Sequence, residues 1–262
     1  MKVVLFCGGF GLRLRDYHEQ IPKPMVPVGP RPILWHIMRY YAHFGHQDFV
    51  LCLGHQGDVI KDYFLRYNEA ISNDFVLSGG GREVRLLSSD IDHWRVTFAD
   101  SGLRSNLGQR LRSVRGHLEG EDVFLANYGD VVTDAPLDEH IERFKASGKV
   151  AAFLAVRPNY SFHIVQQGDS DLVTAIQGID EAELWINGGF FMFRKEIFDY
   201  MEPGDELVVE PFQRLVKEEQ LLAFRYRGFW APMDTLKDRE TLERLHAEGR
   251  PPWAVWRQPE PV

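Results

Sequence analysis

Residues 3–13 read VVLFCGGFGLR, and residues 22–24 follow as PKP. The run from Val3 to Cys7 is apolar and rich in β-branched side chains, which is typical of a strand buried on both faces. The glycines that follow allow backbone N–H groups to approach phosphate oxygens, helped by the positive end of a helix that begins nearby. This stretch predicts either a phosphate-binding loop or a tight turn without a ligand.

Two basic residues favour the phosphate-binding interpretation. Arg13 closes the glycine-rich stretch, and Lys23 follows ten residues later between two prolines, which are expected to hold it on a stiff extended segment. A guanidinium and an ammonium can share a triphosphate with the backbone amides of Gly8, Gly9 and Gly11. A nucleoside triphosphate is therefore the predicted ligand.

Strands and helices alternate along the first half of the chain. Further apolar runs of strand length occupy residues 48–53, 95–99, 122–127 and 150–156, and helical spacing indicates helices over 33–41, 59–67 and 137–147. This alternation predicts an α/β fold with a mostly parallel central sheet and helices on both faces. Shorter segments at 162–166, 173–177, 186–193 and 222–226 are expected to form a small mixed β extension over the active site, before a last helix at 236–247.

Two aspartates stand where a metal ion can be held. Ligand sites of open parallel sheets lie at the carboxyl ends of the strands, and Asp130 follows Gly129 at such an end. Mg²⁺ needs one or two carboxylates and takes its other ligands from water and phosphate. Asp234, directly before the last helix, is the second candidate. Asp130 is alternatively a turn residue, and Asp234 alternatively a helix N-cap.

Composition limits the classes of function. The net charge of −8 over 262 residues argues against a nucleic-acid surface and against binding to anionic lipid, although residues 1–31 are locally basic and suit a small polyanion. No apolar run is long enough for a signal peptide or a membrane span, so a cytoplasmic location is expected. Cys7 and Cys52 lie in apolar runs and are interpreted as small buried side chains.

The order and spacing of these motifs resemble the bacterial sugar-1-phosphate nucleotidyltransferases. The motifs that carry the resemblance are GGFGLR at 8–13, PKPM at 22–25, GD at 129–130, NGG at 187–189 and MD at 233–234. Supporting stretches at 32–38, 57–64 and 229–236 are most like the glucose-1-phosphate cytidylyltransferases. The resemblance implies one Rossmann-like domain over residues 1–262, with a nucleotide-binding core at 1–156 and, at 157–262, a sugar-binding extension with the C-terminal helix. Together with aromatic residues in the tail, it also suggests a homo-oligomer.

The implied reaction is transfer of a nucleotidyl group, with cytidylyl from CTP favoured, to a sugar 1-phosphate, and release of pyrophosphate. Arg13 would grip the leaving β- and γ-phosphates, and Lys23 would neutralise charge on the α-phosphate and the acceptor phosphate. Asp130 and Asp234 would hold Mg²⁺ as the metal ligands.

Further residues are assigned by position in the family pattern. Gly108 and Arg110 would lie near the nucleotide together with Gly8. Asn187, Gly188 and Glu210 fall where the family contacts sugar hydroxyls, which suit an amide or a carboxylate. Asn187 is alternatively a plain turn residue.

The chain departs from the family pattern mainly on the acceptor side. Leu12 replaces a common threonine, and residues 161–163 read SFH where relatives usually have Arg-Phe-Gly. Residues 178–185 lack the Glu-Lys-Pro of relatives, whose lysine contacts the sugar phosphate, and contain Asp180, Glu181 and Glu183 instead. The hypothesis is that the triphosphate half of the site is intact and the acceptor half altered, for example to receive an acceptor with an amino group.

Two other functions are weighed against this interpretation. A non-catalytic protein that binds a nucleotide or nucleotide sugar on the same fold fits the missing lysine, but such a protein has no need to keep two metal carboxylates. A dinucleotide-dependent oxidoreductase fits poorly, because the third glycine of that fingerprint is absent and Lys23 would have no part in it.

Overall fold

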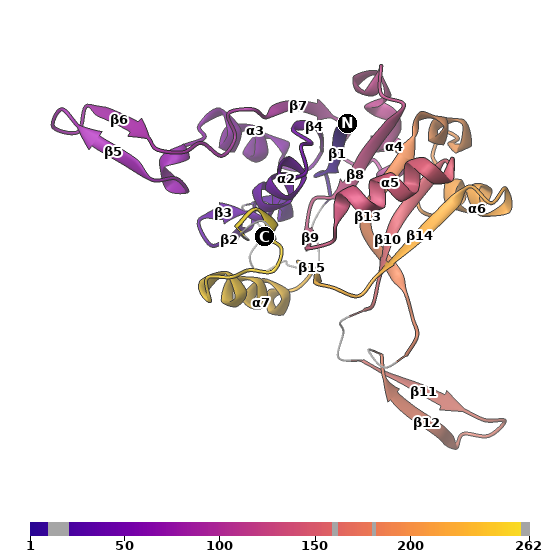
Figure 1. The fold of residues 1–262 in the computed structure, drawn as a ribbon. Helices are drawn as coiled ribbons and strands as arrows, with labels where there is room; N and C mark the ends of the chain where they lie inside the picture. Colours follow the sequence, from indigo (N-terminus) through magenta and orange to yellow (C-terminus); the bar gives the residue numbers. More distant parts are fainter. Residues whose placement is uncertain (10–20, 159–161, 180–181, 258–262) are drawn as a thin grey trace.

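The computed structural model describes residues 1–9, 21–158, 162–179 and 182–257 (Figure 1). A seven-stranded sheet forms the body, in the order β14-β10-β13-β8-β1-β4-β7. Its strands along the chain are β1 (Lys2–Phe6), β4 (Asp48–Leu53), β7 (Arg95–Asp100), β8 (Val123–Tyr128), β10 (Ala151–Val156), β13 (Ile186–Arg194) and β14 (Leu221–Tyr226).

The sheet is parallel except for one strand. β1 pairs in parallel with β4 and β8, β4 with β7, and β10 with β14, whereas β13 runs antiparallel to both β8 and β10. The predicted mostly parallel sheet is confirmed. The carboxyl ends of all its strands but β13 therefore meet at one edge, where β13 begins.

Helices cover both faces of the sheet, as predicted. On one face lie α2 (Ile33–His43), α3 (Gly57–Leu65), α5 (Leu137–Ser147) and α7 (Leu236–Ala247), and on the other α4 (Leu107–Ser113), η5 (Lys195–Tyr200) and α6 (Glu210–Lys217). Side chains of a strand alternate between faces, so Leu5 joins the first core and Val4 the second. Burial of both sets explains why β1 is apolar throughout. Among the described residues, none of the helices is both long and apolar enough to cross a bilayer.

The later strands are placed differently from the predicted extension. β13 and β14 are built into the central sheet, so the expectation that they form part of a separate β layer is wrong for these two. The reason is the burial of their apolar side chains: Phe191 and Phe224 lie in the two cores. Strands within the central sheet bury more apolar surface than strands in a separate layer over its edge would. Short elements complete the chain: η2 (Lys23–Met25), β2 (Pro27–Val28), β3 (Arg31–Pro32), η3 (Glu69–Ile71), η4 (Arg115–Leu118), β9 (Val131–Thr133), β15 (Trp230–Pro232) and η6 (Val255–Arg257).

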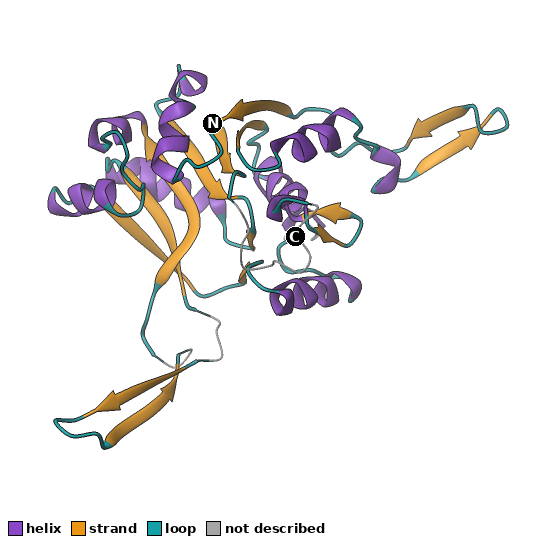
Figure 2. Cartoon of the chain, turned by 180° about the vertical axis from the view of Figure 1, so that it is seen from behind, coloured by secondary structure: helices purple, strands orange, loops and turns teal. Residues whose placement is uncertain are grey.

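Two β-hairpins project from the body (Figures 1 and 2). One pairs β11 (His163–Gln167) with β12 (Val173–Gly178), both of which the sequence predicted as strands, and it stands away from the sheet in both views. The other pairs β5 (Phe75–Ser78) with β6 (Glu83–Leu86) and was not predicted.

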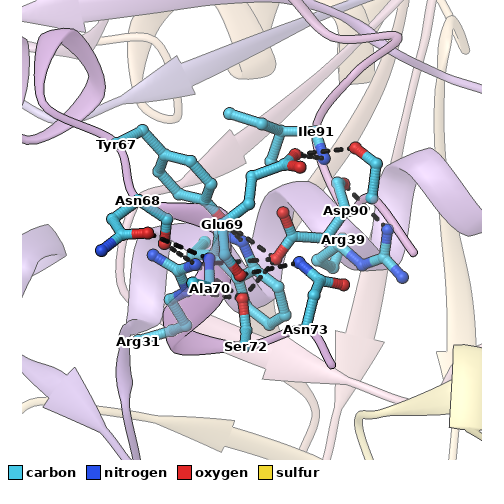
Figure 3. Close-up of polar contacts among 12 residues, drawn as sticks. Arg31, Arg39, Tyr67, Asn68, Glu69, Ala70, Ser72, Asn73, Asp90 and Ile91 are labelled. Atoms are coloured by element: carbon cyan, nitrogen blue, oxygen red, sulfur yellow. Dashed lines mark hydrogen bonds and ion pairs between the residues drawn. The ribbon is translucent and has the colours of Figure 1, made fainter. Parts of the chain in front are cut away.

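A buried arginine ties the base of the β5–β6 hairpin to the body (Figure 3). Arg31 donates to Ser72 Oγ at 2.6 Å and to the Asn68 carbonyl at 2.8 Å. Asp90 accepts hydrogen bonds from Ser72 and Tyr67, and its carboxylate lies 3.8 Å from the Arg31 guanidinium. The segment between α3 and β7, which contains the hairpin, is therefore anchored at both ends to Arg31, whose charge is compensated by Asp90.

Candidate active site

A cavity of about 480 Å³ opens at the carboxyl edge of the sheet, beside the ends of β1 and β8. Its wall combines six segments of the chain. They are residues 6–9, residues 23–24, residues 103–107 with Arg110, residues 128–131, Glu206 and Asp234. The cavity lies at the strand ends, where the sequence predicts the ligand site.

Lys23 enters the cavity from a tight turn. The chain is extended at Pro22 and then forms the 3₁₀ turn η2, closed by a hydrogen bond from Met25 N–H to the Pro22 carbonyl at 2.8 Å. The expected extended segment around Lys23 is therefore wrong after Pro22, because Pro24 has the φ that the first positions of a helical turn require. Pro24 also packs beside Gly129, which leaves the lysine side chain on the cavity side.

Asp130 and Asp234 are brought together by a short pair of strands. β9 and β15 are antiparallel with Val131 opposite Pro232, and Met233 N–H donates to the Asp130 carbonyl at 2.9 Å. Asp234 follows directly. It is not the N-cap of α7, because Thr235 takes that role in a capping box with Asp238. The Asp234 carboxylate therefore faces the cavity instead of the helix end.

The two carboxylates hold the Lys23 ammonium. Lys23 Nζ lies 2.5 Å from Asp130 Oδ2 and also forms an ion pair with Asp234 Oδ1. Burial alone lowers the pKa of Lys23, but the two carboxylates outweigh it and raise the pKa above its ordinary value. The lysine thus stays charged, and the trio carries one net negative charge.

Asp130 and Asp234 are the candidate ligands for a divalent metal ion. Within the described part of the chain, no group of three or more His, Cys, Asp or Glu side chains could hold a metal. Two carboxylates beside an open cavity nevertheless suit Mg²⁺, which takes its remaining ligands from water and phosphate oxygens. The residues present fit a metal that arrives with a polyphosphate.

Arg110 stabilises the turn at Gly8, where the glycine-rich stretch begins. Its side chain is 4% exposed and donates to the carbonyls of Leu53 and Gly8, at 3.1 and 2.8 Å, and to Ser101 Oγ at 2.7 Å. A Cβ added to Gly8 would lie 2.1 Å from this guanidinium, so the glycine allows the close approach. Arg110 lines the cavity, and most of its donors already form hydrogen bonds at the ends of β1, β4 and β7.

The glycine-rich stretch is only partly within the described residues. Gly8 and Gly9 line the cavity, whereas Gly11, Leu12 and Arg13 lie outside the described residues. Gly108 follows the cavity residue Leu107 in α4 and does not itself line the cavity. A Cβ at this position would come within 2.2 Å of the Asp205 carbonyl. Packing of the 205–207 segment against α4 explains that glycine without reference to a ligand.

The cavity wall also contains the carboxylate of Glu206, which the sequence did not single out. Glu210, the predicted sugar contact, begins α6 and accepts a hydrogen bond from the Glu206 backbone N–H, but it does not line the cavity. Glu206 does line it, and burial raises the pKa of its carboxyl group. No local signal distinguishes the two glutamates, because the difference arises from how residues 204–207 dock on α4.

Asn187 and Gly188 start β13 at the same edge. Asn187 Nδ2 donates to Tyr128 Oη at 3.2 Å, and its Oδ1 accepts the Gly189 N–H at 2.9 Å. The Gly188 carbonyl accepts Trp230 Nε1–H at 2.8 Å. Gly189 has φ +78°, and a Cβ there would collide with the Tyr128 ring. Asn187 thus both shapes a turn and orients Tyr128, a cavity residue whose place directly before Gly129 could have marked it.

The altered segment at 178–185 is partly described. Asp180 and Glu181 lie outside the described residues, and Glu183 is exposed. Of residues 161–163, Ser161 also lies outside them, and His163 is exposed at the start of the β11–β12 hairpin.

Comparisons with known proteins give matches over nearly the whole chain. A family model described as nucleotidyl transferase matches residues 2–238. The chain is 36% identical over 260 residues to a glucose-1-phosphate cytidylyltransferase of Salmonella typhi, covering 98% of this chain and 100% of that protein. A relative of the same name in Salmonella typhimurium is 35% identical over 257 residues, with the same coverage.

Solved structures share the fold at lower identity. A UDP-glucose pyrophosphorylase complexed with UDP-glucose superposes with a TM-score of 0.69 at 15% identity, over 95% of this chain and 99% of that one. HddC from Yersinia pseudotuberculosis gives a TM-score of 0.66 at 20% identity, over 94% and 99%. These structures establish the architecture.

Proposed function

The chain belongs to the nucleotidyl transferase family, and from that premise we propose that it transfers a cytidylyl group from CTP to the phosphate of a sugar 1-phosphate, releasing pyrophosphate. The observation that carries this proposal is the position of Lys23, held between two carboxylates at the edge of the sheet where the glycine-rich stretch begins. The cytidylyltransferase relatives, which match over their full length, support the choice of nucleotide and acceptor.

The reaction requires positioning and charge neutralisation more than covalent chemistry. An oxygen of the acceptor phosphate attacks the α-phosphorus in line, and the bond to the pyrophosphate leaving group breaks. The acceptor phosphate is already ionised at neutral pH, so no protein nucleophile is needed. Lys23, kept charged by its surroundings, neutralises the charge that develops on the α-phosphate. Arg13 is proposed for the leaving phosphates.

We further propose that Asp130 and Asp234 hold Mg²⁺ together with the polyphosphate. When bound, the ion would neutralise phosphate charge and orient the phosphates for displacement. Arg110 holds the Gly8 turn in place, and the Tyr128–Asn187 pair shapes the side on which the sugar is expected to lie.

Pyrophosphate release by the purified protein tests the proposal. The protein is incubated with Mg²⁺, each of CTP, UTP, dTTP, ATP and GTP, and a panel of sugar 1-phosphates that includes glucose 1-phosphate. We expect release with CTP that stops when EDTA is added. Binding of nucleotide without release for every pair would contradict transfer and favour the non-catalytic alternative.

A further inference from the structure

Three arginines surround one tryptophan at the carboxyl edge of the sheet. The guanidinium carbons of Arg157, Arg225 and Arg227 lie 6.0, 5.2 and 5.4 Å from the centroid of the Trp185 ring. We call these four residues the Trp185 cluster. Trp185 belongs to the segment in which the sequence shows acids and no basic residue. The basic side chains are supplied by other strands.

The topology explains why the four residues meet. Arg157 directly follows β10, and Arg225 lies in β14, opposite Ala155 in the parallel pair. Arg227 is the residue after β14 ends at Tyr226. Trp185 immediately precedes β13, which begins opposite Val156. The cluster therefore stands on the same edge of the sheet as Asp130, over the strands on its acceptor side.

The positive charges of the cluster have no acidic partner among the described residues. None of the described carboxylates forms an ion pair with any of the three arginines, and Glu183, two residues before Trp185, is exposed. Arg157 donates one hydrogen bond to the Ala182 carbonyl at 2.8 Å, while its Nε is buried without a hydrogen-bond partner. The indole face offsets only part of the repulsion between three cations. An anion bound among them would remove it.

The strand order separates the cluster from the reacting centre. Asp130 follows β8, and β13 and then β10 and β14 lie beyond it in the sheet. Neighbouring strands are about 4.8 Å apart, which places the ends of β10 and β14 roughly 10 and 14 Å from the end of β8. The phosphate that attacks the α-phosphorus must lie beside Lys23. A group held by the cluster is thus at the other end of the acceptor.

We propose that the Trp185 cluster binds a second anionic group of the acceptor, so that the substrate is a sugar 1-phosphate bearing a carboxylate or a further phosphate remote from the reacting phosphate. This inference rests on the proposed transfer reaction and names its acceptor class. Guanidinium groups bind both anions in a bidentate manner, and Trp185 keeps the three of them oriented. This acceptor differs from the amino-substituted one considered from the sequence, whose added group is positively charged. The sequence does not show which strand ends meet Trp185, so the three arginines could not be taken into account there.

The test compares acceptors of different charge with CTP. The ratio of kcat/KM for glucose 1,6-bisphosphate, and separately for glucuronate 1-phosphate, to that for glucose 1-phosphate is measured in the wild-type protein. The same ratios are measured in Arg157→Gln, in the double variant Arg225→Gln/Arg227→Gln, and in the control Arg66→Gln, an exposed arginine on the body. Thermal unfolding confirms that each variant is folded.

We expect wild-type ratios of about 10 to 100 for at least one of the two acceptors that carry a second anionic group, since a charge-assisted hydrogen bond contributes that much to binding. The cluster variants should bring the ratios close to one, and Arg66→Gln should not. A wild-type ratio near one for both acceptors, or a preference for glucosamine 1-phosphate, would overturn the proposal while leaving transfer itself intact.

A second measurement separates failure of the anion subsite from failure of the reaction. Calorimetry gives the dissociation constants of glucose 1,6-bisphosphate and glucose 1-phosphate for the same proteins without turnover. If no acceptor releases pyrophosphate but the bisphosphate binds more tightly in a cluster-dependent way, the transfer function fails and the subsite stands. Equal dissociation constants in wild type and cluster variants overturn the subsite.

Discussion

The Lys23 trio and the Trp185 cluster both gather charge at one edge of the sheet, but they balance it differently. Lys23 is enclosed by Asp130 and Asp234, so its charge is compensated before any ligand arrives. In the Trp185 cluster, three guanidiniums face one ring and no described carboxylate pairs with them. In the proposed function the first arrangement is a preorganised reaction centre, and in the proposed subsite the charge of the second is balanced when an anion binds. The following predictions test that difference.

Removing the compensated charge should have the largest effect. Lys23→Ala leaves Asp130 and Asp234 facing each other and removes the cation that meets the α-phosphate. We expect kcat with CTP to fall by about 10² to 10³, which is typical for loss of one preorganised electrostatic group. Lys217→Ala, at the exposed end of α6, is the matched control. A loss below tenfold would mean that Lys23 only neutralises the aspartates.

Disturbing the support of the nucleotide side should cost less. Gly8→Ala forces its new Cβ against the Arg110 guanidinium and shifts the turn that follows β1. We expect kcat/KM for CTP to fall by about 10- to 100-fold, as small displacements in a catalytic site commonly do. Gly116→Ala, where nothing lies within 4 Å of the added carbon, should behave as wild type. Unchanged kinetics of Gly8→Ala would show that the turn tolerates displacement.

A substitution at Asn187, which lies between the Lys23 trio and the Trp185 cluster, should affect binding of the acceptor but not of CTP. Asn187→Ala removes the amide that holds Tyr128 Oη and the Gly189 N–H. We expect KM for the sugar 1-phosphate to rise by about tenfold, the worth of one or two hydrogen bonds, while KM for CTP stays within twofold. Equal increases in both KM values would place Asn187 in the general architecture of the site instead.

The smallest effect should be on stability and should depend on pH. Burial raises the pKa of Glu206 above its ordinary value of 4.5, so the folded protein takes up this proton more readily than the unfolded chain. The cost of an ionised Glu206 is therefore absent below pH 4.5 and complete above the raised pKa. Glu206→Gln should raise the Tm at pH 8 relative to wild type and lose that advantage at pH 4.

Thermal unfolding at both pH values, with Glu142→Gln on the exposed side of α5 as control, measures this effect. The prediction fails if Glu206→Gln changes the Tm equally at pH 4 and pH 8. A stabilised variant with reduced activity would show that the carboxylate is kept for binding at a cost in stability.

Much of the local structure could be predicted from the sequence. The strand Asp48–Leu53 and the helices Leu137–Ser147 and Leu236–Ala247 have the expected bounds, because the period of apolar residues is a local property. The buried cysteines were predicted for the same reason, and Lys23, Asp130 and Asp234 were singled out by motifs at strand and helix ends.

The tertiary structure decided which of these groups meet. Asp234 reaches Asp130 only because β15 pairs with β9, and Glu206 rather than Glu210 lines the cavity because its segment docks on α4. The Trp185 cluster depends on β10, β13 and β14 being neighbours. Periodicity shows that a segment is a strand and which side chains share a face. The order of strands in the sheet depends on how the whole chain buries its apolar surface, and with it the balance of charge at the site.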